Sequence, residues 1–155
     1  MSATPGFAER GGWWVVVQGL LLAALAFAGP AVGTLTPGAA LFAACLLLAG
    51  AVALGAWAAL ALGKALTPYP HPLEDAELCM RGPYGLVRHP IYSAVLLAAA
   101  GWALLWQSAT AGVLVIALYV FFELKSQREE RWLLEKDARY SQYRRQTKKF
   151  IPYLR

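Results

Sequence analysis

Charged residues are absent from two long stretches of the chain, and both stretches are strongly apolar. Arg10 and Lys64 enclose 53 residues without Asp, Glu, Lys or Arg, and Arg88 and Glu123 enclose a further 34. A helix needs about 20 apolar residues to cross the roughly 30 Å of hydrocarbon in a bilayer. The first stretch therefore predicts two membrane spans joined by a short turn, and the second predicts a shorter pair.

Glycine, proline and polar residues divide these stretches into four predicted spans. We place the spans at residues 13–28, 39–62, 90–106 and 109–124. Gly29 and Pro30 close the first span, because both residues disfavour further helix. Gln107 and Ser108 separate the third span from the fourth. The last two spans are short and adjacent, so they predict a helical hairpin.

The span at 39–62 is dense in Ala and Gly, which let helix backbones approach closely, so it is predicted to be an interior helix. The fourth helix is expected to continue past Glu123 into water. The sequence therefore predicts an all-α integral membrane protein with about four transmembrane helices, the last two a hairpin, followed by a cytoplasmic C-terminal helix. A single domain over residues 1–155 accounts for the whole pattern.

Composition agrees with a membrane protein. Of the 155 residues, 59% are hydrophobic and 15% are charged, whereas soluble domains carry roughly 25% charged residues. The N-terminus places Glu9 beside Arg10 ahead of an apolar run long enough to span, so we expect a first membrane helix rather than a cleaved signal. Cys45 lies in an apolar span and Cys79 in a polar loop, which suggests neither a disulfide framework nor a zinc site.

The distribution of Lys and Arg predicts the orientation. One lies before the first span, three lie between residues 64 and 88, ten lie between residues 125 and 155, and none lies in either short turn. The positive-inside rule places both termini and the long loop on the cytoplasmic side of the membrane. We expect that membrane to be a bacterial-type inner (plasma) membrane. Because the basic tail directly follows a span, it predicts contact with anionic membrane lipid rather than with nucleic acid.

A first polar cluster, GPYGLVRHPIY, spans residues 82–92 at the entry to the third span. Arg88 and the tyrosines have an ordinary interpretation as interfacial anchors, and Pro90 suits the first turn of a helix. In a binding site, Arg88, His89 and the tyrosines offer hydrogen-bond donors to an anionic ligand, while the glycines let the backbone pass close to it.

A second polar cluster begins at Glu123, where the fourth span ends. Glu123 and Glu130 are seven residues apart and lie near one helical face, with Glu129 beside them. One interpretation is a solvated helix with weak ion pairs; the other is a pair of carboxylates placed to bind a partner. Familiar soluble sites are absent, since the chain has no phosphate loop and no GxGxxG pattern. With two histidines and no HExxH, a catalytic metal is not expected.

Taken together, the two clusters resemble the isoprenylcysteine carboxyl methyltransferase family and the related membrane phospholipid methyltransferases. The resemblance lies in G-x-Y-x-x-x-R-H-P-x-Y before a hairpin, then E-E-x-x-L, then Y-x-x-Y and a proline. The matching residues are Gly82, Tyr84, Arg88, His89, Pro90 and Tyr92, then Glu129, Glu130 and Leu133, then Tyr140, Tyr143 and Pro152.

The resemblance implies that S-adenosylmethionine binds in a cytoplasm-facing region within residues 82–152. The implied cofactor-binding residues are Tyr84, Val87, Arg88, His89, Pro90, Tyr92, Glu129, Glu130 and Tyr143. The implied catalytic residues are Glu130, which would take or orient a proton, and Lys136, which falls where the family often has an arginine close to the acceptor.

The methyl acceptor implied by the resemblance is a lipophilic or prenylated carboxylate that enters from the bilayer. A carboxylate needs no base, whereas an amine or thiol does. Two alternatives keep the same cofactor and change the acceptor, to a phospholipid amine or to a small thiol. A third alternative is a non-catalytic membrane scaffold with the same fold.

Overall fold

The computed structural model describes residues 6–35, 37–71 and 77–152, and this part of the chain is helical apart from loops and turns. The helices are α1 (Gly12–Val32), α2 (Ala39–Leu62), α3 (Pro90–Leu105), α4 (Ala109–Lys136) and α5 (Arg139–Gln146), with short 3₁₀ turns η1 (Gly63–Ala65) and η2 (Gly82–Gly85). Three of them, α1, α2 with η1, and α4, are long and apolar enough to cross a membrane, and α3 is a shorter apolar helix. The predicted all-α membrane architecture is confirmed.

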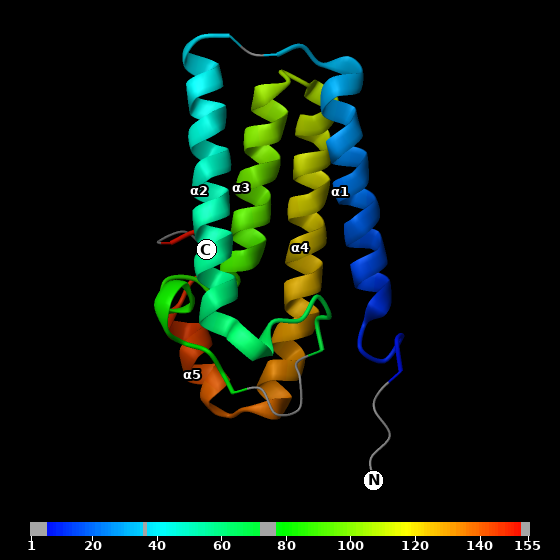
Figure 1. Cartoon of the computed structure of the whole chain (residues 1–155). Coiled ribbons are helices and arrows are strands. Elements are labelled where there is room, and N and C mark those ends of the chain that lie inside the picture. Colours follow the sequence, from blue (N-terminus) through cyan, green and yellow to red (C-terminus); the bar gives the residue numbers. More distant parts are fainter. Residues whose placement is uncertain (1–5, 36, 72–76, 153–155) are drawn as a thin grey trace.

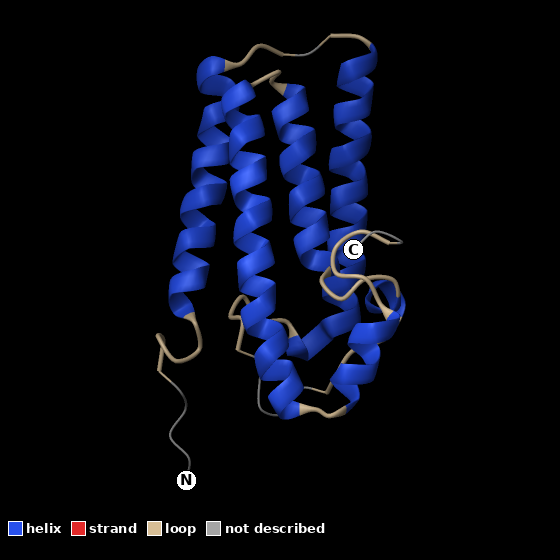
Figure 2. Ribbon diagram, turned by 180° about the vertical axis from the view of Figure 1, so that it is seen from behind, coloured by secondary structure: helices blue, strands red, loops and turns tan. Residues whose placement is uncertain are grey.

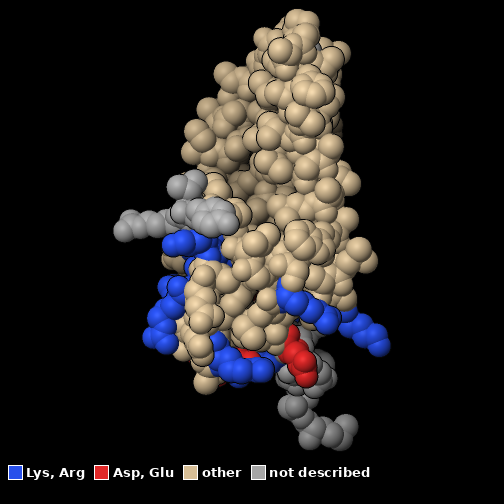
Figure 3. Space-filling model, turned by 90° about the vertical axis from the view of Figure 1, so that its left-hand side faces the viewer, with Lys and Arg blue, Asp and Glu red and all other residues tan. Residues whose placement is uncertain are grey.

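The four long helices stand side by side in the order α2, α3, α4, α1, with the α3–α4 hairpin in the middle (Figures 1 and 2). Because the helices alternate in direction, the start of α1, the end of α2, the start of α3 and the end of α4 share one end of the bundle, where α5 also lies. On the face seen in Figure 3, the Lys, Arg, Asp and Glu side chains gather at this same end. Residues 1–5 and 153–155 lie outside the described part of the chain. The start of α1 and helix α5 lie at the charged end, and the side of the membrane that this end faces stays a prediction.

Small residues bring α2 and α3 into close contact. Ala44, Ala51 and Ala58 recur every seven residues and are buried. A Cβ on Gly101 of α3 would lie 3.1 Å from two α2 leucine side chains, so only glycine fits without displacement. These small residues form one stripe, however, and Leu60 on another face is 80% exposed. The prediction that this helix is interior was wrong: it lies at the edge of the row (Figure 1).

The prediction that Gly29 and Pro30 close the first span was also wrong, because α1 continues to Val32 with Pro30 inside it. A proline this close to the C-terminus removes one hydrogen bond of the last turns, and Gly33 still donates its N–H to the carbonyl of Gly29 at 2.9 Å. Gly29 has a packing role, since a Cβ there would lie 2.7 Å from each of two tryptophan rings of α3 and its C-cap.

The predicted break between the last two spans is confirmed at Gln107 and Ser108. Gln107 has a positive φ of 46°, which reverses the chain, and Ser108 caps α4. Its hydroxyl accepts from the N–H of Ala111 (3.2 Å) and donates to the carbonyl of Ala28 (3.1 Å), which ties the hairpin to α1. The 28 residues of α4 extend for about 42 Å, longer than the hydrocarbon layer, so the helix continues past Glu123 as predicted.

After α5 the chain returns to the start of α3. Val87 forms an isolated parallel bridge with Lys148, and the N–H groups of Arg88 and His89 donate to the carbonyls of Lys148 (2.8 Å) and Lys149 (3.1 Å). Phe150 is buried in the core beside α4. These contacts hold the two polar clusters of the sequence against each other.

Candidate active site

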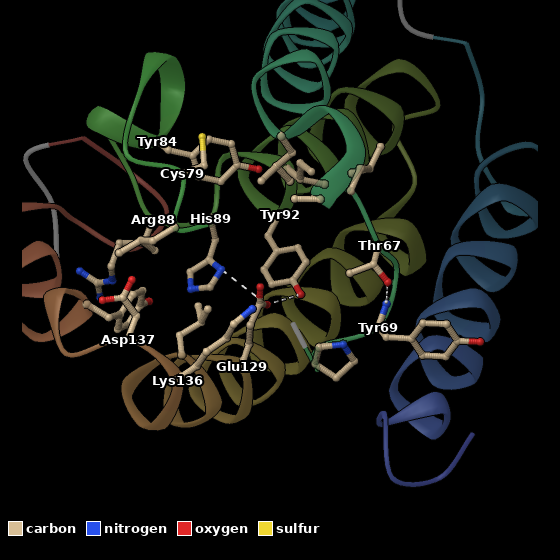
Figure 4. A pocket seen from close by; sticks show the side chains of 18 of the residues that line it. Thr67, Tyr69, Cys79, Tyr84, Arg88, His89, Tyr92, Glu129, Lys136 and Asp137 are labelled. Atoms are coloured by element: carbon tan, nitrogen blue, oxygen red, sulfur yellow. Dashed lines mark hydrogen bonds and ion pairs between the residues drawn. The ribbon is translucent and has the colours of Figure 1, made fainter. Parts of the chain in front are cut away.

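A cavity of about 680 Å³ lies at the charged end of the bundle (Figure 4). Its wall is built from the end of α2, the loop at 65–70, residues 77–79, the start of α3, the last turns of α4 and α5. Seven residues predicted from the sequence line it: Tyr84, Arg88, His89, Tyr92, Glu129, Lys136 and Tyr143. The other three predicted residues, Val87, Pro90 and Glu130, are buried behind the wall.

Glu130 is the centre of a buried ionic network. Its Oε1 lies 2.9 Å from Nε of Arg88 and 3.1 Å from Nε2 of His89, and its Oε2 lies 3.2 Å from Nε of Arg144. The guanidinium of Arg88 also donates to the carbonyl oxygens of Arg144 (3.1 Å) and Thr147. Three cationic or donor groups around one carboxylate favour its charged form and fix the orientation of Arg88 and His89.

Tyr92 and Glu129 form the neighbouring part of the wall. The hydroxyl of Tyr92 donates to Oε2 of Glu129 at 2.8 Å. The Tyr92 ring is stacked between His89, with centroids 5.3 Å apart, and Phe122, with centroids 4.5 Å apart. This stack runs from the core to the cavity and fixes the Tyr92 ring, whose hydroxyl in turn holds the Glu129 carboxylate in place.

Two further tyrosines connect α5 to η2. The hydroxyl of Tyr143 donates to the backbone carbonyl of Tyr84 at 2.6 Å, and both residues are buried. Burial raises the pKa of the Tyr143 hydroxyl to about 12, and burial likewise raises the pKa of Tyr84. Both hydroxyls are therefore protonated at neutral pH, so each has a proton to donate.

Tyr140 differs from Tyr143 although the two rings are in edge contact, 5.7 Å apart. Tyr140 lines the cavity and is 1% exposed, yet its hydroxyl has no hydrogen-bond partner among the described residues. Burial raises the pKa of this hydroxyl, so it also keeps its proton. A buried donor without a partner is uncommon in native proteins, and because Tyr140 also lines the cavity its hydroxyl is a candidate for a ligand contact.

Sequence reasoning missed part of the wall, notably Lys125, Gln18 and Arg139. Lys125 is buried within the charged end of α4, although its position among the ten basic residues from 125 to 155 predicted contact with lipid headgroups. The usable signal was Gln18, the one strongly polar side chain in the span at 13–28, since polar residues within a membrane helix are costly and commonly functional. In the described part of the chain, no group of three or more His, Cys, Asp or Glu side chains is placed to hold a metal ion.

The fold and the site define the class of protein: a helical membrane protein with a small-molecule cavity at its charged end. The family model for phospholipid methyltransferase matches residues 39–139, and the chain belongs to this family. The match starts at the first residue of α2 and ends just before Tyr140. It supports a membrane methyltransferase and represents a broader family than the isoprenylcysteine type suggested by the sequence motifs.

The chain is similar to the cobalt-zinc-cadmium resistance protein CzcN of Cupriavidus metallidurans, with 32% identity over 82 residues. The matched segment covers 52% of this chain and 38% of that relative. No solved structure matches the chain.

Proposed function

We propose that this protein is an S-adenosylmethionine-dependent methyltransferase of the isoprenylcysteine carboxyl methyltransferase type, acting on a lipophilic or prenylated carboxylate. The observation that carries the proposal is a cavity where membrane helices meet the charged end, lined by cations, carboxylates and tyrosine side chains. Its volume of about 680 Å³ falls within the range of roughly 300–1,000 Å³ typical of small-molecule sites.

The chemistry of the wall fits the proposed cofactor, which carries a carboxylate, an ammonium group and ribose hydroxyls. Glu129 offers an acceptor for the ammonium or ribose groups, and Arg88 and Lys136 offer positive charge for the carboxylate. The hydroxyl of Tyr140, which has no partner among the described residues, offers a donor. The wall thus holds complementary groups for each polar part of the ligand.

When bound, S-adenosylmethionine supplies an electrophilic methyl group on sulfur. Transfer of this group to an acceptor carboxylate would break the carbon–sulfur bond, leave its electron pair on sulfur and require no residue of the protein to remove a proton. The protein therefore has to align the reactants and exclude water.

The Glu130 carboxylate is 3% exposed and engaged by two guanidinium groups and an imidazole. We assign it a positioning role, through which it holds Arg88 and His89 toward the cavity. Lys136, in the wall near the end of α4, is proposed to lie close to the acceptor. Because the cofactor is water-soluble and cytoplasmic, this end of the bundle and both termini are proposed to face the cytoplasm.

Calorimetric titration of the purified protein with S-adenosylhomocysteine tests the proposal. Glu129→Gln should weaken binding by roughly tenfold or more, because a hydrogen bond to a charged group contributes about 1.5–3 kcal/mol. Glu135→Gln is the matched control, since Glu135 is an exposed carboxylate on the same helix and should leave the affinity unchanged. Absence of binding to the unaltered protein at high micromolar ligand, or equal effects of both substitutions, would refute the proposed site.

The acceptor requires a separate experiment. Transfer of a radiolabelled methyl group should be compared for a prenylcysteine carboxylate, phosphatidylethanolamine and a small thiol. The family name favours the phospholipid amine as the second candidate, for which Glu129, the glutamate that lines the cavity, would have to assist removal of a proton. Label in the amine but not in the carboxylate would overturn the proposed acceptor and leave the methyltransferase assignment intact.

A further inference from the structure

The side of the cavity nearest α1 contains a buried lysine that forms no ion pair within 4.0 Å among the described residues. Lys125 is 1% exposed, and its ammonium group donates to Oε1 of Gln18 (2.7 Å) and to the backbone carbonyl of Pro68 (3.1 Å). Both acceptors are neutral. Among the described residues, no carboxylate forms an ion pair with this ammonium group within 4.0 Å.

This arrangement differs from that of other cations near the cavity. Arg88 has the Glu130 carboxylate at 2.9 Å, and Arg139 has the Asp137 carboxylate at 2.7 Å. Two neutral hydrogen bonds fix the position of Lys125, and the Glu129 carboxylate, four residues further along α4, acts on its charge from beyond ion-pair distance. Burying a charge without a close partner costs free energy. Since Lys125 lines the cavity, an anion bound there would supply the missing charge.

Lys125 lies away from the cluster around Arg88. Its Nζ is 5.3 Å from the centroid of the Tyr92 ring and bonds to the carbonyl of Pro68. In Figure 4, Arg88 lies on one side of Tyr92, whereas Thr67 and Tyr69, which flank Pro68, lie on the other side toward α1. Arg88 and Lys125 therefore belong to two separate parts of the cavity, with the Tyr92 ring between them.

The surroundings of Lys125 suit a ligand with an apolar chain. Lys125 lies two residues past Glu123, at the boundary of the apolar part of α4. Leu62 and Leu66, from the end of α2 and the following loop, line the same cavity. Gln18 comes from within α1 and accepts from Lys125 through its amide oxygen, so its NH₂ group is the end of the amide that can donate to a ligand.

We propose that Lys125 and Gln18 form an anion-binding subsite for the methyl acceptor, holding the negatively charged group of a lipophilic molecule. The identification of this ligand as the acceptor rests on the proposed methyltransferase function. The anionic group is a carboxylate or a phosphate, since an ammonium donor with an adjacent amide NH₂ suits either. Its apolar chain extends toward the membrane helices, while the region around Arg88 and Glu129 takes the methyl donor.

A binding assay with matched amphiphiles tests the subsite. The probes are radiolabelled dodecanoate, dodecyl phosphate and the neutral dodecanamide, measured by equilibrium dialysis at a fixed concentration of non-ionic detergent, with and without S-adenosylhomocysteine. The unaltered protein should prefer at least one anionic probe over the amide by roughly tenfold or more, as expected for a charged hydrogen bond. The stronger of the two anions identifies carboxylate or phosphate.

Lys125→Met should abolish the preference for the anionic probe, and Lys125→Arg should retain most of it. Lys64→Met is the control for general surface charge, because Lys64 is an exposed lysine beside the cavity-lining Ala65, and the preference should persist. If Lys125→Met does not fold, judged by loss of its thermal transition, Gln18→Met is measured instead, and it should reduce the preference.

Three results would overturn the subsite: no preference in the unaltered protein, a preference that persists in Lys125→Met, or an equal loss in Lys64→Met. A purely structural role for Lys125 would lower thermal stability without changing the ratio of the anion to the amide affinity. Failure of the proposed function would instead appear as no binding of S-adenosylhomocysteine, while the preference measured without that ligand still decides the subsite.

Discussion

Tyr140 and Tyr143 provide a matched pair of substitutions that separates a ligand-binding hydroxyl from a structural one. Both are buried tyrosines of α5, and their rings contact each other. The Tyr143 hydroxyl donates to a backbone carbonyl at 2.6 Å, whereas the Tyr140 hydroxyl has no partner among the described residues. Replacing each with phenylalanine removes one oxygen atom and keeps the ring.

Different effects are expected on stability. Tyr143→Phe leaves the buried carbonyl of Tyr84 without its donor, which costs about 1–3 kcal/mol. For a chain of this length, each kcal/mol corresponds to roughly 2–4 °C in the midpoint of thermal unfolding. Tyr140→Phe removes a buried polar atom that has no protein partner, so the midpoint without ligand should be unchanged or higher.

For ligand binding the loss is expected in Tyr140→Phe, the variant that should keep its thermal stability. If the Tyr140 hydroxyl donates to the cofactor, Tyr140→Phe should lower the affinity for S-adenosylhomocysteine by about tenfold, which corresponds to roughly 1.4 kcal/mol. Thermal unfolding in detergent and calorimetric titration measure the two quantities on the same preparations. If Tyr140→Phe destabilises the free protein as much as Tyr143→Phe and leaves the affinity unchanged, the assignment of this hydroxyl to a ligand is wrong.

Two other matched pairs test the architecture. Glu130→Gln should destabilise the protein by about 3–5 kcal/mol, because it removes the buried negative charge between the cationic partners. Glu123→Gln disrupts a more exposed ion pair and should cost about 0–1 kcal/mol. Similar thermal unfolding midpoints for the two variants would argue against a buried network. Gly101→Ala should destabilise the protein by about 1–3 kcal/mol, because the added methyl group overpacks the α2–α3 contact. Gly112→Ala should be neutral or should stabilise the protein by up to about 1 kcal/mol, because a Cβ there meets no atom within 4 Å. Equal melting temperatures in the glycine pair would contradict the close approach of α2 and α3.

Local patterns in the sequence were sufficient to predict the helices, because each depends on residues close together in the chain. The long stretches without charge predicted the spans, and Gln107 with Ser108 predicted the hairpin turn. The end of α1 was predicted too early, since one proline near a C-terminus removes too little hydrogen bonding to stop the helix. The edge position of α2 was also missed, because an abundance of small residues does not show that they lie on a single face.

For the candidate site, the sequence was sufficient to predict which residue types gather at the charged end, and seven of the predicted residues line one cavity. Their environments could be known only from the packing of the helices. It placed Glu130 behind the wall and Glu129 on it, gave a partner to Tyr143 but not to Tyr140, and brought Lys125 to Gln18 across 107 positions of the chain. The physical reason is that burial and hydrogen-bond partners depend on which elements meet in space, whereas helix formation and membrane insertion depend on neighbouring residues.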